Sequence, residues 1–435
     1  MFAVFAKWDN MLNNNSDNKD SNHKLIYNTI MLYLLTGSNY FFGLITMPYL
    51  SRVLGPEFYG HVGFGSAFES IVQLVLDFGF IISGTMAIAK IQDDLVEVKR
   101  VCSAVTYAKL FLVIPTIVVV LVLCNTVSRF QQEPALFIFY ALYAVCVTLT
   151  PDFLYRGLED MKTITFRSVL IKIFFVICIY IFIREPEQYY LVPLFYFLGA
   201  FGGLIAVLWH QYYVKHIWFV RVPVSDIFRE FKSSAMFFLS RVAGQMLASF
   251  NTLLLGFIYP TGPTIGYYTS ANNIINAGRN AITPVTGSVF PHMVKTKNFN
   301  LLFKVLLFGE IIICLCCLPV GVFAPQICEI LFGKGYAPTG DILRILLPIL
   351  PFSLATYLIG WSALGALGLE KYTNYSVYVG ASFQAAFLGV LFLFGNLNVL
   401  TIAAVTTFDE AIILTLRAIA FAIGLKKYNN NLLEV

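Results

Sequence analysis

The sequence predicts an all-α, polytopic membrane protein with about twelve transmembrane helices. Hydrophobic residues make up 58% of the 435 residues and charged residues 12%, against roughly 45–50% and about 25% in soluble globular proteins. The mean hydropathy is +0.76. A soluble chain of this size cannot bury so much apolar surface with so few charges facing water. Twelve spans of about 20 residues leave only short connections, which excludes a large soluble domain.

Apolar runs separated by polar residues locate the spans. At Pro151, Pro348 and Pro351 a span kinks or ends, because proline breaks the helical hydrogen-bond pattern. The predicted helices are 25–51, 60–89, 101–124, 134–156, 163–183, 190–214, 230–258, 264–292, 301–323, 340–367, 373–395 and 398–424.

The distribution of basic residues predicts the orientation. With the N-terminus placed in the cytoplasm, nineteen Lys and Arg residues fall on the cytoplasmic side, four on the opposite side and six inside spans. Cytoplasmic loops carry the excess of Lys and Arg in membrane proteins. Both termini are therefore expected in the cytoplasm, and the net charge of +5 requires no nucleic-acid partner. The expected organisation is a disordered cytoplasmic tail (1–24), a six-helix bundle (25–214), a cytoplasmic linker (215–229), a second six-helix bundle (230–425) and a cytoplasmic tail (426–435).

No pattern of metal ligands, cofactor contacts or catalytic residues stands out. The eight cysteines lie mostly inside apolar runs, so we interpret them as packing residues. The five histidines lie near span ends or in the tails. The sequence contains no phosphate-binding P-loop and no serine triad, and no metal or cofactor is expected.

A weak internal repeat relates the two halves. Gly55-Pro56 opens the second span and Gly262-Pro263 the eighth, while the sequence Gly-Leu-Glu at 157–159 and again at 368–370 closes the fourth and tenth. Because six spans separate the members of each pair, the halves have the same orientation. Parallel repeats of this kind are typical of transporters that alternate access around a central site. We therefore expect two parallel six-helix bundles around a hydrophilic lumen.

Several charged side chains fall deep inside the predicted spans, where each costs several kcal/mol unless it is paired or hydrated. They form polar stripes on spans 2, 7 and 8, and further charges lie on spans 5, 9 and 12. The residues are Glu69, Gln73 and Asp77; Arg241, Gln245, Ser249 and Thr252; Asn272, Asn276, Arg279 and Thr283; and Lys172, Glu310, Asp409 and Glu410.

Two interpretations of these stripes remain open. Carboxylates and guanidinium groups could neutralise each other across a dry helix interface, or all could face one aqueous cavity between the halves. Charges nearer the span ends have simpler explanations. Lys109, Arg344 and Arg417 are expected to extend to the membrane surface, and Asp152 is expected to pair with Arg156 four residues later.

At this point the residues resemble a known family. The segment 46–60 (TMPYLSRVLGPEFYG) and the sequence Asp77-Phe78-Gly79 are similar to the N-terminal signature of bacterial polysaccharide flippases of the O-antigen transporter type. These belong to the multidrug/oligosaccharidyl-lipid/polysaccharide exporter superfamily. The blocks 151–159 (PDFLYRGLE) and 251–256 (NTLLLG) are similar to two further blocks, although Leu154-Tyr155-Arg156 replaces the usual aromatic pair before the glycine. The resemblance extends from about 25 to 425.

The resemblance implies transport rather than catalysis. Its expected substrate is an oligosaccharide repeat unit, of O-antigen or another surface polysaccharide, on undecaprenyl diphosphate. This substrate is flipped from the cytoplasmic to the periplasmic leaflet of the inner membrane, with ion coupling. Expected partners are membrane lipid and the polymerase and chain-length proteins of the pathway. The expected diphosphate-binding cations are Arg279, Arg241, Lys172 and Arg52; the coupling-ion or counter-ion candidates are Asp77, Glu69, Glu310 and Asp409; the polar lining is Gln73, Gln245, Asn272 and Asn276.

Three alternatives are weighed against this hypothesis. A cation-coupled drug exporter of the same superfamily would favour carboxylates and aromatics over arginines. A lipid II flippase would show two additional spans. A membrane-embedded glycan polymerase would show a long periplasmic loop with catalytic residues, whereas the longest such loop expected here, about 324–339, carries little beyond Glu329 and Lys334.

Overall fold

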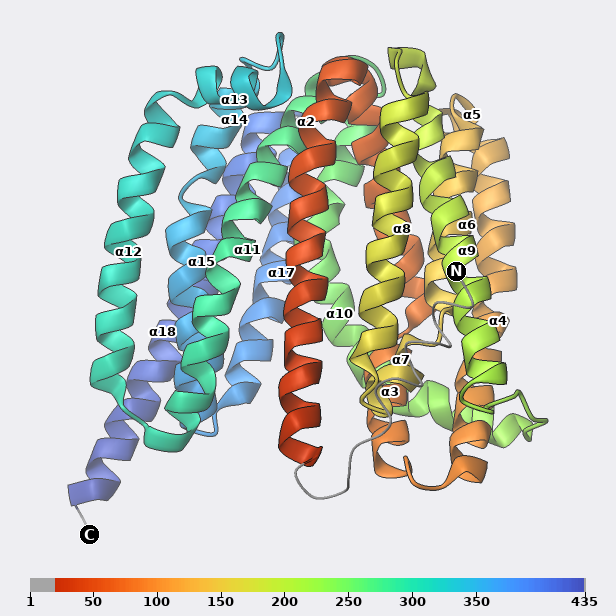
Figure 1. The fold of residues 1–435 in the computed structure, drawn as a ribbon. Helices are drawn as coiled ribbons and strands as arrows, with labels where there is room; N and C mark the ends of the chain where they lie inside the picture. Colours follow the sequence, from red (N-terminus) through yellow and green to blue (C-terminus); the bar gives the residue numbers. More distant parts are fainter. Residues whose placement is uncertain (1–19, 434–435) are drawn as a thin grey trace. The chain divides into compact units, whose positions relative to one another are not determined.

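The computed structural model describes residues 20–433, which are helical apart from short connections (Figure 1). No β-strand occurs within this range. The helices are α2 (Asp20–Asp77), α3 (Phe80–Lys90), α4 (Leu95–Thr126), α5 (Ser128–Gln131), α6 (Pro134–Leu149), α7 (Asp152–Gly157), α8 (Met161–Phe182), η1 (Pro186–Tyr190), α9 (Leu191–Tyr213), α10 (Val224–Ile258), α11 (Thr264–Thr296), α12 (Phe299–Val322), α13 (Ala324–Phe332), α14 (Thr339–Leu346), α15 (Ile349–Tyr357), η2 (Leu358–Ala363), α16 (Leu364–Ala366), α17 (Glu370–Leu393) and α18 (Val399–Leu433).

The chain is a multi-pass membrane protein. Nine helical stretches within the described residues are long and apolar enough to cross a bilayer, and the first, Tyr27–Lys90, has 64 residues. That stretch is divided at Gly55, whose φ of 67° and ψ of 172° interrupt α2. Helices α10 and α11, of 35 and 33 residues, are also long enough but more polar. With this division and these two helices, the described residues contain twelve segments of spanning length, the predicted number.

The described residues pack as two compact units. The first contains residues 20–53 and Gly65–Arg241, and the second contains Leu54–Phe64 and residues 242–433. The expected tail at 1–24 lies mostly outside the described residues, since α2 begins at Asp20. The expected linker 215–229 contains a non-helical stretch followed by the start of α10 at Val224.

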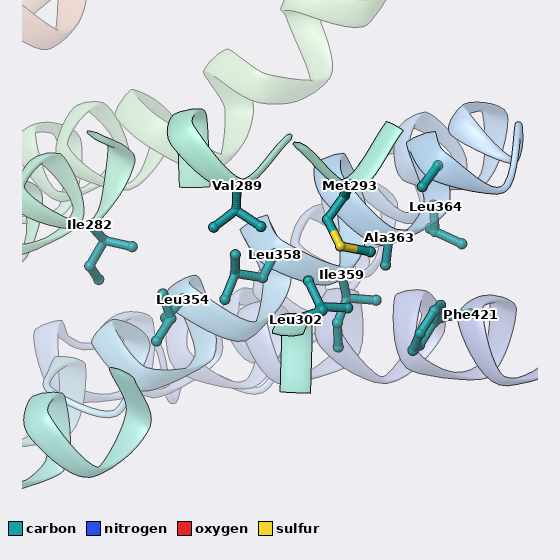
Figure 2. Close-up of a cluster of buried hydrophobic side chains, with 11 residues drawn as sticks. Ile282, Val289, Met293, Leu302, Leu354, Leu358, Ile359, Ala363, Leu364 and Phe421 are labelled. Atoms are coloured by element: carbon teal, nitrogen blue, oxygen red, sulfur yellow. The ribbon is translucent and has the colours of Figure 1, made fainter. Parts of the chain in front are cut away.

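The core of the second unit is built from apolar side chains of six neighbouring helical segments. Helices α11, α12, α15, η2, α16 and α18 contribute to one cluster (Figure 2). Met293, Leu358, Ala363 and Leu364 are fully buried there. In the first unit, Phe80, Cys102, Phe153 and Leu154 belong to a corresponding buried cluster.

The predicted span 60–89 is not one continuous helix. Phe78 and Gly79 have φ angles of 43° and 83° and separate α2 from α3. This break presses against α10 of the same unit. A Cβ atom at Gly79 would lie 2.8 Å from the carbonyl oxygen of Ser234, and the hydroxyls of Ser83 and Ser234 hydrogen bond at 2.6 Å. Glycine is required here both for the backbone conformation and for the close approach of α10.

Proline interrupts two other spans, as expected. Pro151 separates α6 from α7, and the prediction of a kink or end at this point is confirmed. The span predicted at 340–367 consists of α14, α15, η2 and α16, with Pro348 at the junction of α14 and α15. Segment η2 is a π-helical turn, a feature that sequence patterning does not reveal.

We predict that Gly79→Ala destabilises the protein, whereas Gly43→Ala does not. The positive φ of Gly79 alone costs a side chain about 1–2 kcal/mol, and the contact with Ser234 adds to this. A Cβ atom at Gly43 meets nothing within 4 Å, so alanine there is expected to stabilise the helix by about 0.5–1 kcal/mol. Thermal unfolding midpoints of the purified variants in detergent give the comparison. Equal midpoints would contradict the packing described for α3 and α10.

Candidate functional site

Charged residues of the polar stripes predicted from sequence form an ion pair in each unit. In the first unit, Arg241 of α10 donates to the carboxylate of Asp77, at the end of α2. The side chain of Asp77 is 10% exposed and that of Arg241 35% exposed. The rings of Phe78 and Phe238 stack beside this pair, with centroids 4.5 Å apart. The pair therefore joins α10 to the break between α2 and α3.

Glu69 lies two turns before Asp77 on α2 and is buried. No cation forms an ion pair with it within the described part of the chain. Gln73, one turn further along, is half-buried. A carboxyl group in this environment is stable when it is protonated or when it binds a cation.

Lys172 of α8 also lacks an acidic partner among residues 20–433. Its ammonium donates to the hydroxyl of Ser38 at 3.1 Å and to the side-chain oxygen of Asn39. Both partners are neutral groups of α2, so the charge of Lys172 is solvated but not neutralised. Arg52, the fourth candidate cation, is exposed near the kink at Gly55.

The second unit holds Arg279 in a network of three side chains. Its Nη2 donates to Glu410 Oε2 at 2.5 Å and its Nε donates to Ser353 Oγ at 3.0 Å. The hydroxyl of Ser353 lies 3.4 Å from Glu410 Oε1. The network joins α11, α15 and α18, so these three helices fix the position of the guanidinium.

The face of α11 around Arg279 is polar and incompletely covered. Asn276 and Thr283 are exposed, Asn272 is half-buried and Arg279 is 25% exposed. Exposed amide and hydroxyl groups in the middle of a spanning helix are expensive in contact with hydrocarbon. This face is therefore better suited to contact with water or a polar ligand than with lipid.

A second polar network lies deeper in the same unit. Gln384 Nε2 donates to Asn251 Oδ1 at 2.7 Å. Asn251 Nδ2 donates in turn to the hydroxyls of Thr406 at 2.7 Å and Tyr268 at 3.3 Å. One turn after Thr406, Asp409 is 3% exposed, and its Oδ1 has no hydrogen-bond partner among the described residues.

Sequence patterning missed several members of these networks. Ser353, Gln384 and Thr406 are not among the candidate residues, and Glu410 is among the predicted deep charges but has no role assigned to it. The sequence signal for this network is Gln384, a glutamine inside the apolar run 373–395. Of the remaining candidates, Gln245 donates to Ser249 one turn away on α10, and Glu310 is half-buried on α12.

The structure corrects three expectations about the more peripheral charges. Lys109 does not extend to the surface; it is 2% exposed and donates to the carbonyl oxygen of Thr148 at 2.8 Å. Asp152 pairs with Arg167, not Arg156, through two hydrogen bonds of 2.5 and 3.0 Å.

Arg417 is the third correction, since it too is buried. It donates to the carbonyl oxygens of Thr356 and Thr373, at 2.9 and 3.2 Å, and to Ser376 Oγ at 2.9 Å. In contrast, the side chain of Arg344 is 45% exposed, as expected for a residue near a span end. No cluster of three or more His, Cys, Asp or Glu side chains suited to a metal ion occurs between residues 20 and 433.

Comparison with known proteins finds one matching family and relatives that share one name. A family described as polysaccharide biosynthesis protein matches residues 25–297. A protein of Escherichia coli strain K12, provisionally named an O-antigen transporter, is 26% identical over 396 residues, which are 88% of this chain and 91% of that protein. A protein of Shigella dysenteriae with the same name is 26% identical over 366 residues, covering 81% and 89%. The resemblance drawn from the sequence blocks is confirmed.

Two solved structures share the fold. The lipid II flippase MurJ in an inward closed conformation superimposes with a TM-score of 0.68 at 12% identity, covering 91% of this chain and 87% of that one. An inward-facing multidrug resistance transporter of the MATE family and MOP superfamily gives 0.64 at 15% identity, covering 88% and 96%. At these identities the likeness concerns the fold alone.

We predict that Arg279 and Glu410 are energetically coupled. Removing one member of a mostly buried ion pair leaves the other uncompensated. In a double-mutant cycle with Arg279→Ala and Glu410→Gln, we expect a coupling free energy of about 1–3 kcal/mol in thermal stability. The exposed pair Arg344–Asp341, at 3.0 Å, is the matched control and is expected to give below about 1 kcal/mol. Similar coupling for the two pairs would show that the Arg279–Glu410 contact contributes nothing particular.

Proposed function

The chain belongs to the polysaccharide biosynthesis protein family, and we propose that it flips an undecaprenyl-diphosphate-linked oligosaccharide from the cytoplasmic to the periplasmic leaflet of the bacterial inner membrane. The cargo is a repeat unit of O-antigen or another surface polysaccharide, moved by alternating access. Its family and its relatives make the chain a transporter of the flippase class and not an enzyme.

The chemistry of this cargo defines what the transporter must provide. A diphosphate and a glycan cannot cross hydrocarbon unassisted, while a polyprenyl tail can stay in the lipid. The protein therefore needs cations at mid-membrane depth on a face that water can reach. A guanidinium suits a diphosphate because its planar set of N–H donors binds two oxygen atoms at once.

The observation that carries the proposal is the state of Arg279. It lies fifteen residues after the start of α11 at Thr264, roughly 22 Å along the helix axis at 1.5 Å per residue. Glu410 and Ser353 occupy its Nη2 and Nε atoms. Its Nη1 has no hydrogen-bond partner among residues 20–433, and the side chain is 25% exposed. Arg279 is thus held in place and still has a donor for an anionic ligand.

We further propose that transport is coupled to a cation, with Asp409 and Glu69 as the carriers. Both carboxyl groups are buried without an ion-pair partner in the described residues. The Oδ1 atom of Asp409 is unsatisfied, so a proton or a sodium ion there would remove an electrostatic penalty. Asp77 is the weaker candidate, because Arg241 already neutralises it.

We predict that Arg279→Ala abolishes export of surface polysaccharide, whereas Arg279→Lys retains part of it. Lysine preserves the charge but loses the two-pronged geometry. The double variant Arg279→Ala/Glu410→Gln separates binding from folding, because it removes both members of the ion pair. We expect its membrane abundance to recover while export stays below about a tenth of wild type. Surface polysaccharide and membrane abundance are measured together. Normal export in the double variant would show that Arg279 only neutralises Glu410.

We also predict that Phe130 and Ala337 lie on the periplasmic side and that the C-terminus is cytoplasmic. The nineteen-to-four distribution of basic residues supports this orientation. Phe130 lies in α5, and Ala337 lies between α13 and α14. Fusions of alkaline phosphatase at both positions are expected to be active, and a fluorescent protein at Val435 is expected to fold. An inactive phosphatase at either position would overturn the orientation.

A further inference from the structure

In the first unit, α2 and α8 run side by side and are joined by polar contacts along their length (Figure 1). Thr165 Oγ1 donates to the carbonyl oxygen of Met31 at 2.9 Å. Seven residues later on each helix, Lys172 donates to Ser38 at 3.1 Å. Further along, the hydroxyl of Tyr180 donates to the carbonyl oxygen of Ile45 at 3.3 Å. We call this contact line the α2/α8 seam.

An apolar groove follows the seam. It has a volume of 680 Å³ and is lined by residues 27–42 of α2 and 162–169 of α8, which is within the size range of ligand pockets. Leu34 and Phe41 on α2, and Phe166 on α8, line it and remain exposed. The α2 part extends over roughly 22 Å at 1.5 Å per residue, a large part of the hydrocarbon core of about 30 Å.

Beside the groove lies a cation, Lys172, whose charge is not neutralised. Ser38 lines the groove and accepts a hydrogen bond from Lys172. The only other contact that the described residues give this ammonium is the neutral side chain of Asn39. A cation within a bilayer is rare and costly unless it is paired. An anion arriving at Lys172 would therefore be stabilised there.

The depth of Lys172 in the membrane limits which anions can reach its ammonium group. The residue lies eleven positions after Met161 and ten before Phe182, the two ends of α8, about 15–16 Å from each along the axis. The phosphate of a resident phospholipid stays at the headgroup level and does not reach this depth. A lipid whose phosphate is being carried across the membrane does.

We propose that the α2/α8 seam binds the polyisoprenoid chain of a lipid-linked phosphate, with Lys172 facing its phosphate group midway across the membrane. This inference rests on the proposed function and specifies which part of the cargo the first unit recognises. The apolar chain lies in the groove between Leu34, Phe41 and Phe166. The ammonium of Lys172 then exchanges part of its contact with Ser38 and Asn39 for a charge-assisted hydrogen bond to phosphate.

Two glycines of α2 give a matched pair of variants for testing the groove. Gly37 lines it, whereas Gly43 lies six residues further along and is not among its lining residues. A Cβ atom at either position meets nothing within 4 Å, so both positions are open where a new side chain would begin. Gly37→Trp fills the groove and Gly43→Trp leaves it open, with Gly37→Leu as a milder replacement if the tryptophan variant is not recovered as a folded protein.

The assay is photolabelling of purified protein in nanodiscs with a photoreactive polyprenyl phosphate or the matching uncharged polyprenol. For wild type, we expect labelled peptides from α2 and α8 and about tenfold more labelling by the phosphate than by the alcohol. Gly37→Trp is expected to lower phosphate labelling about tenfold, with Gly43→Trp unchanged. Lys172→Gln is expected to equalise the two probes, and Lys172→Arg to restore the preference for phosphate.

Two results would overturn the inference: unchanged labelling in Gly37→Trp, or an undiminished preference for phosphate in Lys172→Gln. Because binding is scored on purified protein, the outcome does not depend on transport. Loss of seam labelling together with normal polysaccharide export would remove this inference alone. Intact seam labelling with normal export in the Arg279→Ala/Glu410→Gln variant would remove only the proposed role of Arg279 in transport.

Discussion

A charge inside hydrocarbon has to be compensated nearby, and this constraint governs how each unit is assembled. Asp77 with Arg241, and Asp152 with Arg167, link helices of the first unit. Arg279 with Glu410 links helices of the second. Apolar packing alone would leave the rotation of these helices weakly determined, because lipid is as apolar as leucine. The ion pairs define the rotation, and they thereby decide which polar groups face inward.

Helix breaks supply compensation where no carboxylate is available. At a helix break, some backbone carbonyl oxygens lose their intrahelical N–H partner and can accept a hydrogen bond from a side chain instead. Lys109 donates to the carbonyl of Thr148, close to the break at Pro151. Arg417 donates to the carbonyl of Thr356, just before the π-helical turn η2. Prolines and irregular turns in this chain therefore provide binding positions for cations as well as bends.

The features that depend on local sequence were predictable. Span positions follow from runs of apolar residues. Helix starts were placed less well: α4 begins at Leu95, after the cap Asp94 and six residues before the predicted start at 101. The break at Phe78–Gly79 was not predicted, because apolar residues stand on both sides of Asp77 and the close approach of α10 cannot be read from the sequence.

The sequence predicted that the charged residues inside the spans need partners, but it did not predict which residues those partners are. Lys109 and Arg417 lie near span ends in sequence, which favours the surface, yet neighbouring helices cover both. Asp152 has Arg156 one turn away, but Arg167 on α8 offers two parallel hydrogen bonds and forms the pair. The position of a residue along its helix can be counted from the sequence. The rotation of that helix about its axis and the identity of its neighbouring helices cannot. The candidate residues Arg279, Asp409 and Glu69 were therefore identifiable as unusual before Glu410, Ser353 and the orphaned Oδ1 atom could be assigned.

The π-helical turn η2 also affects how this chain can be aligned with others. Each residue of a regular helix advances about 100° around the axis, and a π-turn accommodates one additional residue. Residues before Leu358 and after Ala363 consequently lie on faces offset by about that angle. Ser353, which contacts Arg279, and Leu364, in the apolar core, belong to different helical registers. In a relative that lacks one residue here, a regular α-helix would keep the same residues on the same faces on both sides of the turn. A one-residue gap in an alignment at this turn therefore marks a change from π-helix to α-helix and not a change of fold.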